Sequence, residues 1–337
     1  MLINHLNTVE DMKNKIAIFP SYRKGLTNGN PFINRLYDSF PKNVKVLYVY
    51  GRNLTGLCRN LFRANIYIFN WPENVIFNKL GFLQIYVFVL LLSILILRRV
   101  KIVWIFHNIA PHEGHNLYTR FMYRFMMKYS KLIISLSKRG ENFLKSRTTS
   151  SKELYTPHPF KSLGIQNEGH QYLWDFYIWG GINKYKGVAD FLKFFSKVTN
   201  KSKYRILITG KCNDRDYEEQ LKLYLADNVS YINAYIDTEE LISNIAKSRY
   251  VLFPYLEDSV SSSGALMDSL EYGAQVIGPN CGAFKDAKDE GVCLTFNKYE
   301  EILAICDKSL SLDKKLIKNY IKNNTWDKFP QKILSRL

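Results

Sequence analysis

Cysteines are few and follow no pattern that would pair them. The chain of 337 residues holds 5 cysteines without a Cys-x-x-Cys pair, and no secretory signal sequence stands at its start. We therefore expect a reduced, cytosolic protein whose cysteines are core thiols. The length suits two domains of ordinary size, each able to bury a substantial core.

Acidic residues are scarce in the first half of the chain. Residues 1–160 hold 23 Lys and Arg against 7 Asp and Glu, whereas residues 161–337 hold 24 against 23. A half with this excess of positive charge suits nucleic acid, an anionic membrane or a phosphorylated substrate. The sequence shows no zinc-finger spacing, RNP-like strand or convincing helix-turn-helix, so nucleic acid is not an expected partner.

One long apolar run lies in the basic half. Residues 80–97 are almost wholly apolar, and two arginines follow immediately. A helix of this length would span about 27 Å, near the lower limit for crossing a bilayer. The strands on both sides of the run fit one parallel sheet, which a crossover helix joins on one side of any membrane. Three interpretations stay open: a buried crossover helix, one that also dips into the bilayer surface, and a transmembrane span.

Two stretches suggest a metal site, and we predict none at either. Residues 107–115 hold three histidines and a Glu, but the spacing is not His-Glu-x-x-His on a helix, and Pro111 and Gly114 mark a loop. Asp214-Arg215-Asp216 resembles a DxD motif. Since it directly precedes a helical pattern, a helix N-cap is the better interpretation.

Short apolar strands alternate with amphipathic helices along the chain. This alternation predicts an α/β fold of doubly wound parallel sheets. The stretch FPYLEDSVSSSGALMDSLEYGAQVIGPNCGAFKD, residues 253–286, reads as strand, Ser/Gly loop, helix, strand and Gly loop. A helix that opens after such a loop presents free N–H groups and its positive dipole end, which suits a diphosphate. The candidate contacts are Ser261, Ser262, Ser263 and Gly264.

The same stretch resembles the donor-binding signature of GT-B glycosyltransferases of the retaining group 1 type. In that family an acid on the helix, five residues before a Gly, holds the ribose of the donor, and Asp268 stands in that place before Gly273. A second family acid with a catalytic role lies upstream. Glu257 or Asp258 could fill it, the latter as a donor contact.

A glycine turn after the first strand of the second half extends the resemblance. In the family such a turn is followed by a Lys-Gly pair that brings a cation to the donor diphosphate, and Gly180, Gly181 and Lys186 match this pattern. The family arginine is replaced here by Gly181, so Lys184 or a residue from elsewhere would supply a second charge.

Two motifs in the basic half resemble a subgroup that builds bacterial polysaccharides: capsule, exopolysaccharide or O-antigen. They are Asn70-Trp71-Pro72-Glu73 and the stretch from His107 to Glu113. The resemblance implies that both loops line the cleft. His107, His112 and Glu113 would act in catalysis by orienting acceptor or sugar hydroxyls, because imidazole and carboxylate exchange protons or hydrogen bonds near neutral pH. Glu73 would bind acceptor, and a buried structural role for His107 stays open.

The basic half also offers an acceptor loop and a lipid-facing helix. Residues 21–31 form a long, basic loop at the carboxyl end of a strand, where open α/β sheets place ligands. Its candidates are Arg23, Lys24 and Asn30, with a solvated turn as the alternative. The helix at 118–131 places Arg120, Arg124, Lys128 and Lys131 on one face and Phe121, Met122, Phe125 and Tyr129 on the other. Such a helix suits an anionic membrane or, more simply, solvent.

The resemblance implies a GT-B fold with two Rossmann-like, doubly wound domains facing a cleft. We predict an acceptor-binding, membrane-associating domain at 14–160, a nucleotide-sugar domain at 172–312 and a C-terminal helix at 313–337 that crosses back to the first domain. The implied enzyme is a retaining, metal-independent hexosyltransferase without a cofactor. It would move a sugar from a UDP or GDP sugar to a polyprenyl-diphosphate-linked saccharide at the inner face of the cell membrane, for capsule, exopolysaccharide or lipopolysaccharide.

Two rival functions stay open. A nucleotide-sugar epimerase shares the architecture but needs no apolar helix. A non-catalytic, basic membrane or nucleic-acid binding protein on the same scaffold is the other. If the enzyme inverts the anomeric configuration, Glu113 is the candidate base.

Overall fold

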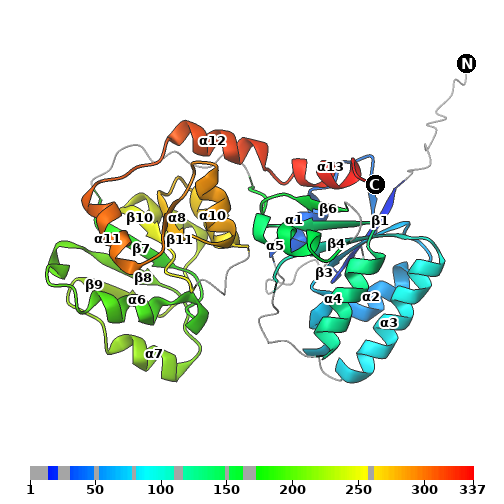
Figure 1. The fold of residues 1–337 in the computed structure, drawn as a ribbon, viewed down its shortest axis with the longest axis horizontal. Helices are drawn as coiled ribbons and strands as arrows, with labels where there is room; N and C mark the ends of the chain where they lie inside the picture. The colour runs from blue at the N-terminus through cyan, green and yellow to red at the C-terminus, as the bar shows by residue number, and fades with distance from the viewer. Residues whose placement is uncertain are drawn as a thin grey trace, which may run out of the picture. The chain divides into compact units, whose positions relative to one another are not determined.

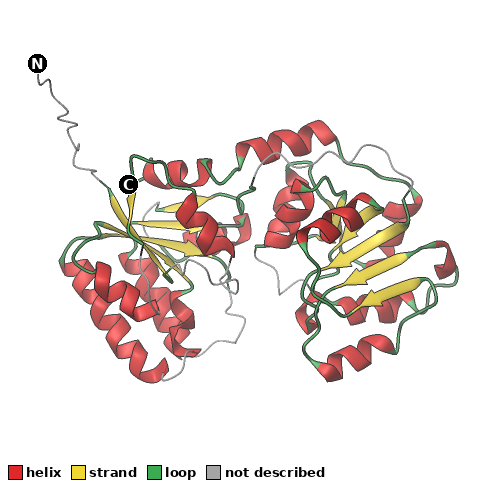
Figure 2. Ribbon diagram, turned by 180° about the vertical axis from the view of Figure 1, so that it is seen from behind, coloured by secondary structure: helices red, strands yellow, loops and turns green. Residues whose placement is uncertain are grey.

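The computed structural model describes residues 14–21, 31–48, 53–77, 81–109, 117–148, 152–161, 172–256 and 262–337. These form two compact units (Figure 1). Unit 1 comprises Met1–Leu136, Gly140–Thr156 and Trp326–Leu337. Unit 2 comprises Ser137–Arg139 and Pro157–Thr325. Each unit has a parallel sheet with helices on both faces (Figure 2).

Unit 1 is built on six strands in the order β2-β1-β3-β4-β5-β6. The strands are short and apolar, and almost all of their central residues are buried, as expected for a sheet covered on both faces. Its elements are β1 (Lys15–Phe19), α1 (Pro31–Asp38), β2 (Lys45–Val46), α2 (Asn53–Asn60), β3 (Ile66–Asn70), the 3-10 helix η1 (Pro72–Phe77), α3 (Gly81–Leu97), β4 (Lys101–Phe106), α4 (Leu117–Tyr129), β5 (Leu132–Ser135), α5 (Lys138–Lys145), β6 (Glu153–Tyr155) and α13 (Lys328–Leu334).

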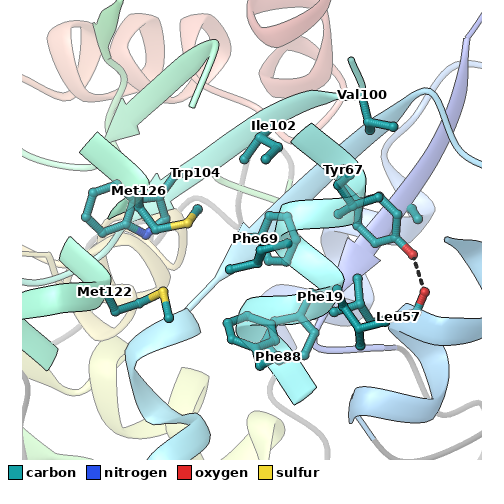
Figure 3. Packing of buried hydrophobic residues seen from close by; sticks show 14 of the residues in the cluster. Phe19, Leu57, Tyr67, Phe69, Phe88, Val100, Ile102, Trp104, Met122 and Met126 are labelled. Carbon is teal, nitrogen blue, oxygen red and sulfur yellow. Dashed lines mark hydrogen bonds between the residues drawn. The ribbon is translucent and has the colours of Figure 1, made fainter. Parts of the chain in front are cut away.

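Two hydrophobic cores cover the faces of this sheet. In one core, the ring of Phe88 from α3 packs 5.1 Å from that of Phe19 from β1, and Met126 of α4 lies near Trp104 of β4 (Figure 3). The Tyr67 hydroxyl of β3 donates a 2.9 Å hydrogen bond to the carbonyl of Leu57 in α2, as Figure 3 shows. The opposite core contains α1 together with the C-terminal residues Trp326, Phe329 and Ile333. The last segment of the chain therefore completes the core of unit 1.

The helix α3 is a crossover between β3 and β4 and buries only one of its sides. Its buried stripe is Phe88, Leu91, Leu92 and Leu95. We call the opposite stripe the α3 surface; it consists of the exposed residues Phe82, Leu83, Tyr86, Val87 and Leu90. Both stripes are apolar and follow the helical period. The sequence is therefore apolar all round although only one side of the helix is buried. Among the described residues, no helix combines the length and apolar character needed to cross a membrane.

The helix α4 exposes its predicted basic residues and part of its predicted aromatic face. Arg120, Arg124 and Lys128 are exposed. Phe121 and Tyr129 are exposed as well, whereas Met122 is buried. The outer side of α4 therefore mixes cations with aromatic rings.

Unit 2 is a second parallel sheet, in the order β12-β11-β10-β7-β8-β9. One core packs α8, α9, α10 and α12 on it, and another packs α6, α7 and α11. Its elements are β7 (Trp174–Trp179), η2 (Lys184–Lys186), α6 (Val188–Phe195), η3 (Lys201–Lys203), β8 (Ile206–Thr209), α7 (Arg215–Lys222), β9 (Val229–Ile232), α8 (Thr238–Ala246), β10 (Ser248–Leu252), α9 (Gly264–Glu271), β11 (Val276–Pro279), α10 (Gly282–Asp289), β12 (Leu294–Phe296), α11 (Tyr299–Asp307) and α12 (Lys314–Asn323).

The cysteines only partly follow the expectation of core thiols. Cys212, Cys293 and Cys306 are buried, and burial raises the pKa of the Cys306 thiol to about 11. Cys58 is exposed on α2, so the expectation is wrong there. All five are free.

Candidate functional site

The strand order of unit 2 fixes where a ligand should bind. Counted from β7 as the first strand, the order is 3-2-1-4-5-6, that of dinucleotide-binding Rossmann sheets. In such sheets the ligand crevice lies outside the carboxyl ends of the two strands where the order reverses, here β7 and β10. The predicted donor residues follow these two strands: Gly180 to Lys186 come after β7, and Ser262 to Asp268 come after β10.

Lys186 folds back over the turn that ends β7. Gly180 has the left-handed φ of +94°, and a methyl group placed on it would lie 3.2 Å from Lys186 Nζ. The ammonium also lies 5.4 Å from the centre of the Tyr255 ring. Burial lowers the pKa of Lys186 to about 8, and no carboxylate within the described ranges forms an ion pair with it. A desolvated cation of this kind is stabilised by any anion that reaches it.

The loop that carries Lys186 is pinned to the segment after β10. Gly187 has a φ of +63°, and a methyl group on it would lie 2.2 Å from the carbonyl oxygen of Pro254, so only glycine fits. The N–H of Leu256 donates a 3.2 Å hydrogen bond to the carbonyl of Tyr185. The two segments at the switch point are thus held against each other.

Tyr255 links Lys186 to the start of α9. Burial raises the pKa of Tyr255, and a hydrogen bond with the Ser263 side chain acts in the opposite direction. Ser263 is the N-cap of α9, since its Oγ accepts a 3.1 Å hydrogen bond from the N–H of Leu266. Because Lys186 lies over the ring of Tyr255 and the Ser263 side chain lies near its hydroxyl, the structure brings the predicted lysine and the predicted helix terminus together around one side chain that we did not predict.

Asp268 lies one turn further along α9. Its carboxylate is 3.8 Å from Lys161 Nζ, which also donates a 3.2 Å hydrogen bond to the Tyr272 hydroxyl. The next residue, Ser269, is fully buried and accepts a 2.9 Å hydrogen bond from the indole N–H of Trp179. This bond holds α9 against β7 and thereby orients Asp268.

Unit 1 has its own switch point, between β1 and β3. At the end of β3, the Asn70 amide donates a 3.2 Å hydrogen bond to the carbonyl of Phe19, while its Oδ1 lies 3.0 Å from His107 Nε2. The amide oxygen can only accept, so Nε2 carries the proton. Trp71 stacks on the imidazole at 4.1 Å and has a left-handed φ of 47°, which is uncommon for a large side chain. His107 is buried and held by both neighbours.

Glu73 lies in η1, beneath this edge. It is 4% exposed, and its Oε2 accepts no hydrogen bond from the described residues. Burial raises the pKa of Glu73 to about 7. Burial also raises the pKa values of Tyr118 and Tyr123, and the charge of Glu73 adds to both shifts. A carboxyl group in this environment is half-neutral near pH 7.

Two further residues singled out in the sequence lie at the start of α7. Asp214 is confirmed as the N-cap of α7 by a 3.1 Å hydrogen bond from the N–H of Tyr217, and Lys184 pairs with Asp214 at 3.3 Å. Within the described part of the chain, no three His, Cys, Asp or Glu side chains form a group that could hold a metal ion. The predicted residues outside the described ranges are Arg23, Lys24, Asn30, His112, Glu113, Glu257, Asp258 and Ser261.

Three residues near Lys186 and the start of α9 were not among the predicted site residues. Tyr255 reads as the end of an apolar strand, and nothing in its neighbours marks it as a contact of Lys186. His158, which stands between two prolines, and Lys161 lie near the predicted boundary of the two domains, where no site residue was predicted. A histidine between two prolines is a possible signal, because its backbone is restricted on both sides.

Comparison with known structures identifies the fold as GT-B and confirms that prediction. The similar structures include Staphylococcus aureus TarM, at 12% identity and a TM-score of 0.59 over 85% of this chain. This chain spans 58% of TarM. The trehalose-6-phosphate synthase OtsA matches at 11% identity and a TM-score of 0.63, over 96% of this chain and 98% of OtsA.

One characterised protein is also similar in sequence. It is the GDP-mannose:glycolipid 4-beta-D-mannosyltransferase of Xanthomonas campestris pv. campestris, which is 23% identical over 275 residues, 79% of this chain and 74% of that protein. No family model matches the chain.

Proposed function

We propose that the protein is a glycosyltransferase that moves a hexose from a nucleotide-diphosphate sugar to a lipid-linked saccharide. The observation that carries this proposal is the desolvated Lys186 ammonium beside the N-terminus of α9, at the switch point of a GT-B nucleotide-binding unit. Both groups attract a diphosphate. Similarity to a mannosyltransferase that uses GDP-mannose, and to TarM, solved with UDP, supports a UDP or GDP donor.

The transfer breaks the bond between the sugar's anomeric carbon and the diphosphate oxygen and forms one to an acceptor hydroxyl oxygen. The acceptor's proton leaves to a base or to the departing diphosphate. Lys186 and the first N–H groups of α9 stabilise the negative charge that develops on the leaving group. Asp268 holds the ribose. These groups supply positive charge from the protein itself, so we propose a metal-independent reaction, with retention of configuration by analogy to the group 1 type.

The acceptor is proposed to be a polyprenyl-diphosphate-linked saccharide of a cell-surface polysaccharide pathway. The glycolipid acceptor in the name of the Xanthomonas relative supports a lipid-borne substrate. Such a substrate stays in the membrane, so the enzyme must come to the inner leaflet.

The α3 surface is the proposed contact with the membrane. Its apolar residues lie on the face of unit 1 that α2 and α4 also cover (Figure 1). Arg98 lies 5.1 Å from the centre of the exposed Phe62 ring, which joins a cation to an apolar group at the end of α3. Apolar side chains surrounded by cations suit an anionic lipid surface. Exposed cations lie on and just after α2, at the end of α3 and on α4: Arg59, Arg63, Arg98, Arg99, Arg120, Arg124 and Lys128.

A transfer assay tests the function. Purified protein is incubated with radiolabelled UDP and GDP sugars, with or without extracted polyprenyl-linked oligosaccharides. We expect label in the lipid fraction with one nucleotide base only. Conversion of the free nucleotide sugar without acceptor would favour the epimerase alternative instead. If no donor is consumed and no nucleoside diphosphate binds, the glycosyltransferase proposal is wrong.

A further inference from the structure

The segment between the units runs along α9 and is firmly attached to it. Phe160 is buried, and its N–H donates a 2.9 Å hydrogen bond to the carbonyl of Asn324. The N–H of Lys161 donates a 2.9 Å bond to the buried carboxylate of Glu271, and Lys161 Nζ reaches Asp268. Residues 158–161 are therefore a structured part of unit 2, not a loose linker.

This attachment places His158 at the first residue of α9. A methyl group on Gly264 would lie 3.6 Å from His158 Nε2 and 3.9 Å from its Cε1. On the other side of the ring, Nδ1 lies 3.2 Å from the carbonyl oxygen of Pro159. Since a carbonyl only accepts, Nδ1 carries a proton, and a second proton on the ring must reside on Nε2, the nitrogen beside Gly264.

We propose that His158 is a third ligand of the donor's diphosphate, and this inference rests on the proposed glycosyltransferase function. Lys186 approaches the start of α9 through Tyr255 and Ser263, and His158 approaches it at Gly264. A diphosphate bound to the N–H groups of α9 would lie within reach of Nε2. The protonated imidazole then donates a charge-assisted hydrogen bond to a phosphate oxygen. His158 would thus take the place of the cation that Gly181 cannot supply.

Two substitutions separate a ligand role from a structural one. The amide nitrogen of His158→Asn occupies the position of Nδ1 and can still donate to Pro159, whereas that of His158→Gln occupies the position of Nε2. Binding of UDP and GDP is measured by calorimetry. For the base that wild type prefers, we expect His158→Ala and His158→Asn to weaken binding about tenfold, the size of one charged hydrogen bond. His158→Gln should remain within about threefold.

The nucleoside monophosphate of the same base is the internal control. We place the contact at the second phosphate, which the monophosphate lacks, and therefore expect its affinity to change little in all three variants. Melting temperatures confirm that each variant folds. Retention of diphosphate affinity in His158→Asn with loss in His158→Gln would show a structural role and overturn the proposal. Wild-type affinity in every variant would also overturn it, because His158 would then have no role in binding. If wild type itself binds neither nucleotide while remaining folded, the proposed donor site fails, and this inference fails with it.

Discussion

The two switch points of the molecule hold side chains of opposite charge, and burial shifts the pKa of each toward its neutral form. At the edge of unit 2, burial lowers the pKa of Lys186 to about 8. At the edge of unit 1, burial raises the pKa of Glu73 to about 7. Each group is moved toward its neutral form, but only Lys186 lies beside a helix N-terminus and an aromatic face. An anion bound beside Lys186 would restore the full charge of this lysine.

Unit 1 offers a different environment at the corresponding edge. His107 is enclosed by Asn70, Trp71 and Phe32. The ring centres of Trp71 and Phe32 lie 4.1 and 4.9 Å from that of the imidazole, and Asn70 Oδ1 is within hydrogen-bond distance of Nε2. Aromatic faces and neutral hydrogen-bonding groups suit a sugar better than a phosphate. The contrast shows that one sheet architecture can carry different environments in the loops at the ends of its strands.

Removing Lys186 should give the largest effect. We expect Lys186→Ala to reduce sugar transfer by about 10²–10³-fold, the range found when one preorganised charge donor is lost from a site. Lys184→Ala is the matched control, since this neighbouring lysine is exposed and pairs with Asp214. In wild type, diphosphate binding should weaken as pH rises through about 8, because the free ammonium loses its proton there. Equal transfer by both variants would contradict the donor site.

The close approach at Gly187 should dominate the stability of the donor loop. The change Gly187→Ala combines a positive φ with a 2.2 Å contact to a backbone oxygen, so we expect a loss of about 2–4 kcal/mol in the free energy of unfolding. The control is Gly264→Ala, where the added methyl meets its nearest atom at an ordinary 3.6 Å. Urea unfolding of both variants measures the difference. A smaller loss for Gly187→Ala than for Gly264→Ala would show that the loop is not pinned as described.

Much of the fold could be predicted because its strands are nearly uninterrupted apolar runs separated by turn residues. β1, β4 and β5 are three such runs, at Lys15–Phe19, Lys101–Phe106 and Leu132–Ser135. The apolar run around β2 is longer than the strand, because only Lys45–Val46 pairs, and it pairs with a single parallel neighbour, β1. Local composition does not reveal how far an edge strand pairs.

The site was less predictable, for physical reasons that particular residues illustrate. Lys186 and Ser263 could be named from local patterns of glycine, lysine and serine. Their meeting at Tyr255 depends on how the loops after β7 and β10 pack, which no local pattern encodes. The left-handed backbone of Trp71 is similarly imposed by its surroundings, because a large residue does not favour it.

Glu73 should make the stability of unit 1 depend on pH. Its pKa is about 7 when folded and near 4.5 for the same side chain in water, so the folded state binds the extra proton between these values. The stabilisation is complete below about pH 4.5 and is lost as pH rises through about 7, by roughly 3 kcal/mol. Glu73→Gln should remove this part of the pH dependence, measured as urea midpoints from pH 5 to 8. Parallel pH profiles for variant and wild type would show that the carboxyl titrates normally.

Exposed apolar residues in the two units should differ in their effect on lipid binding, although this is the smallest change we expect. The variant Leu83→Ser with Tyr86→Ser alters the α3 surface, and the control Leu223→Ser with Tyr235→Ser alters residues of unit 2 that are more exposed. In sedimentation with vesicles containing phosphatidylglycerol, we expect about tenfold weaker binding for the first variant and unchanged binding for the control, from the apolar area removed. Binding of wild type should also fall in high salt, since the surrounding cations are screened. Equal loss in both variants would mean that apolar exposure in general, and not the α3 surface, attracts the protein to lipid.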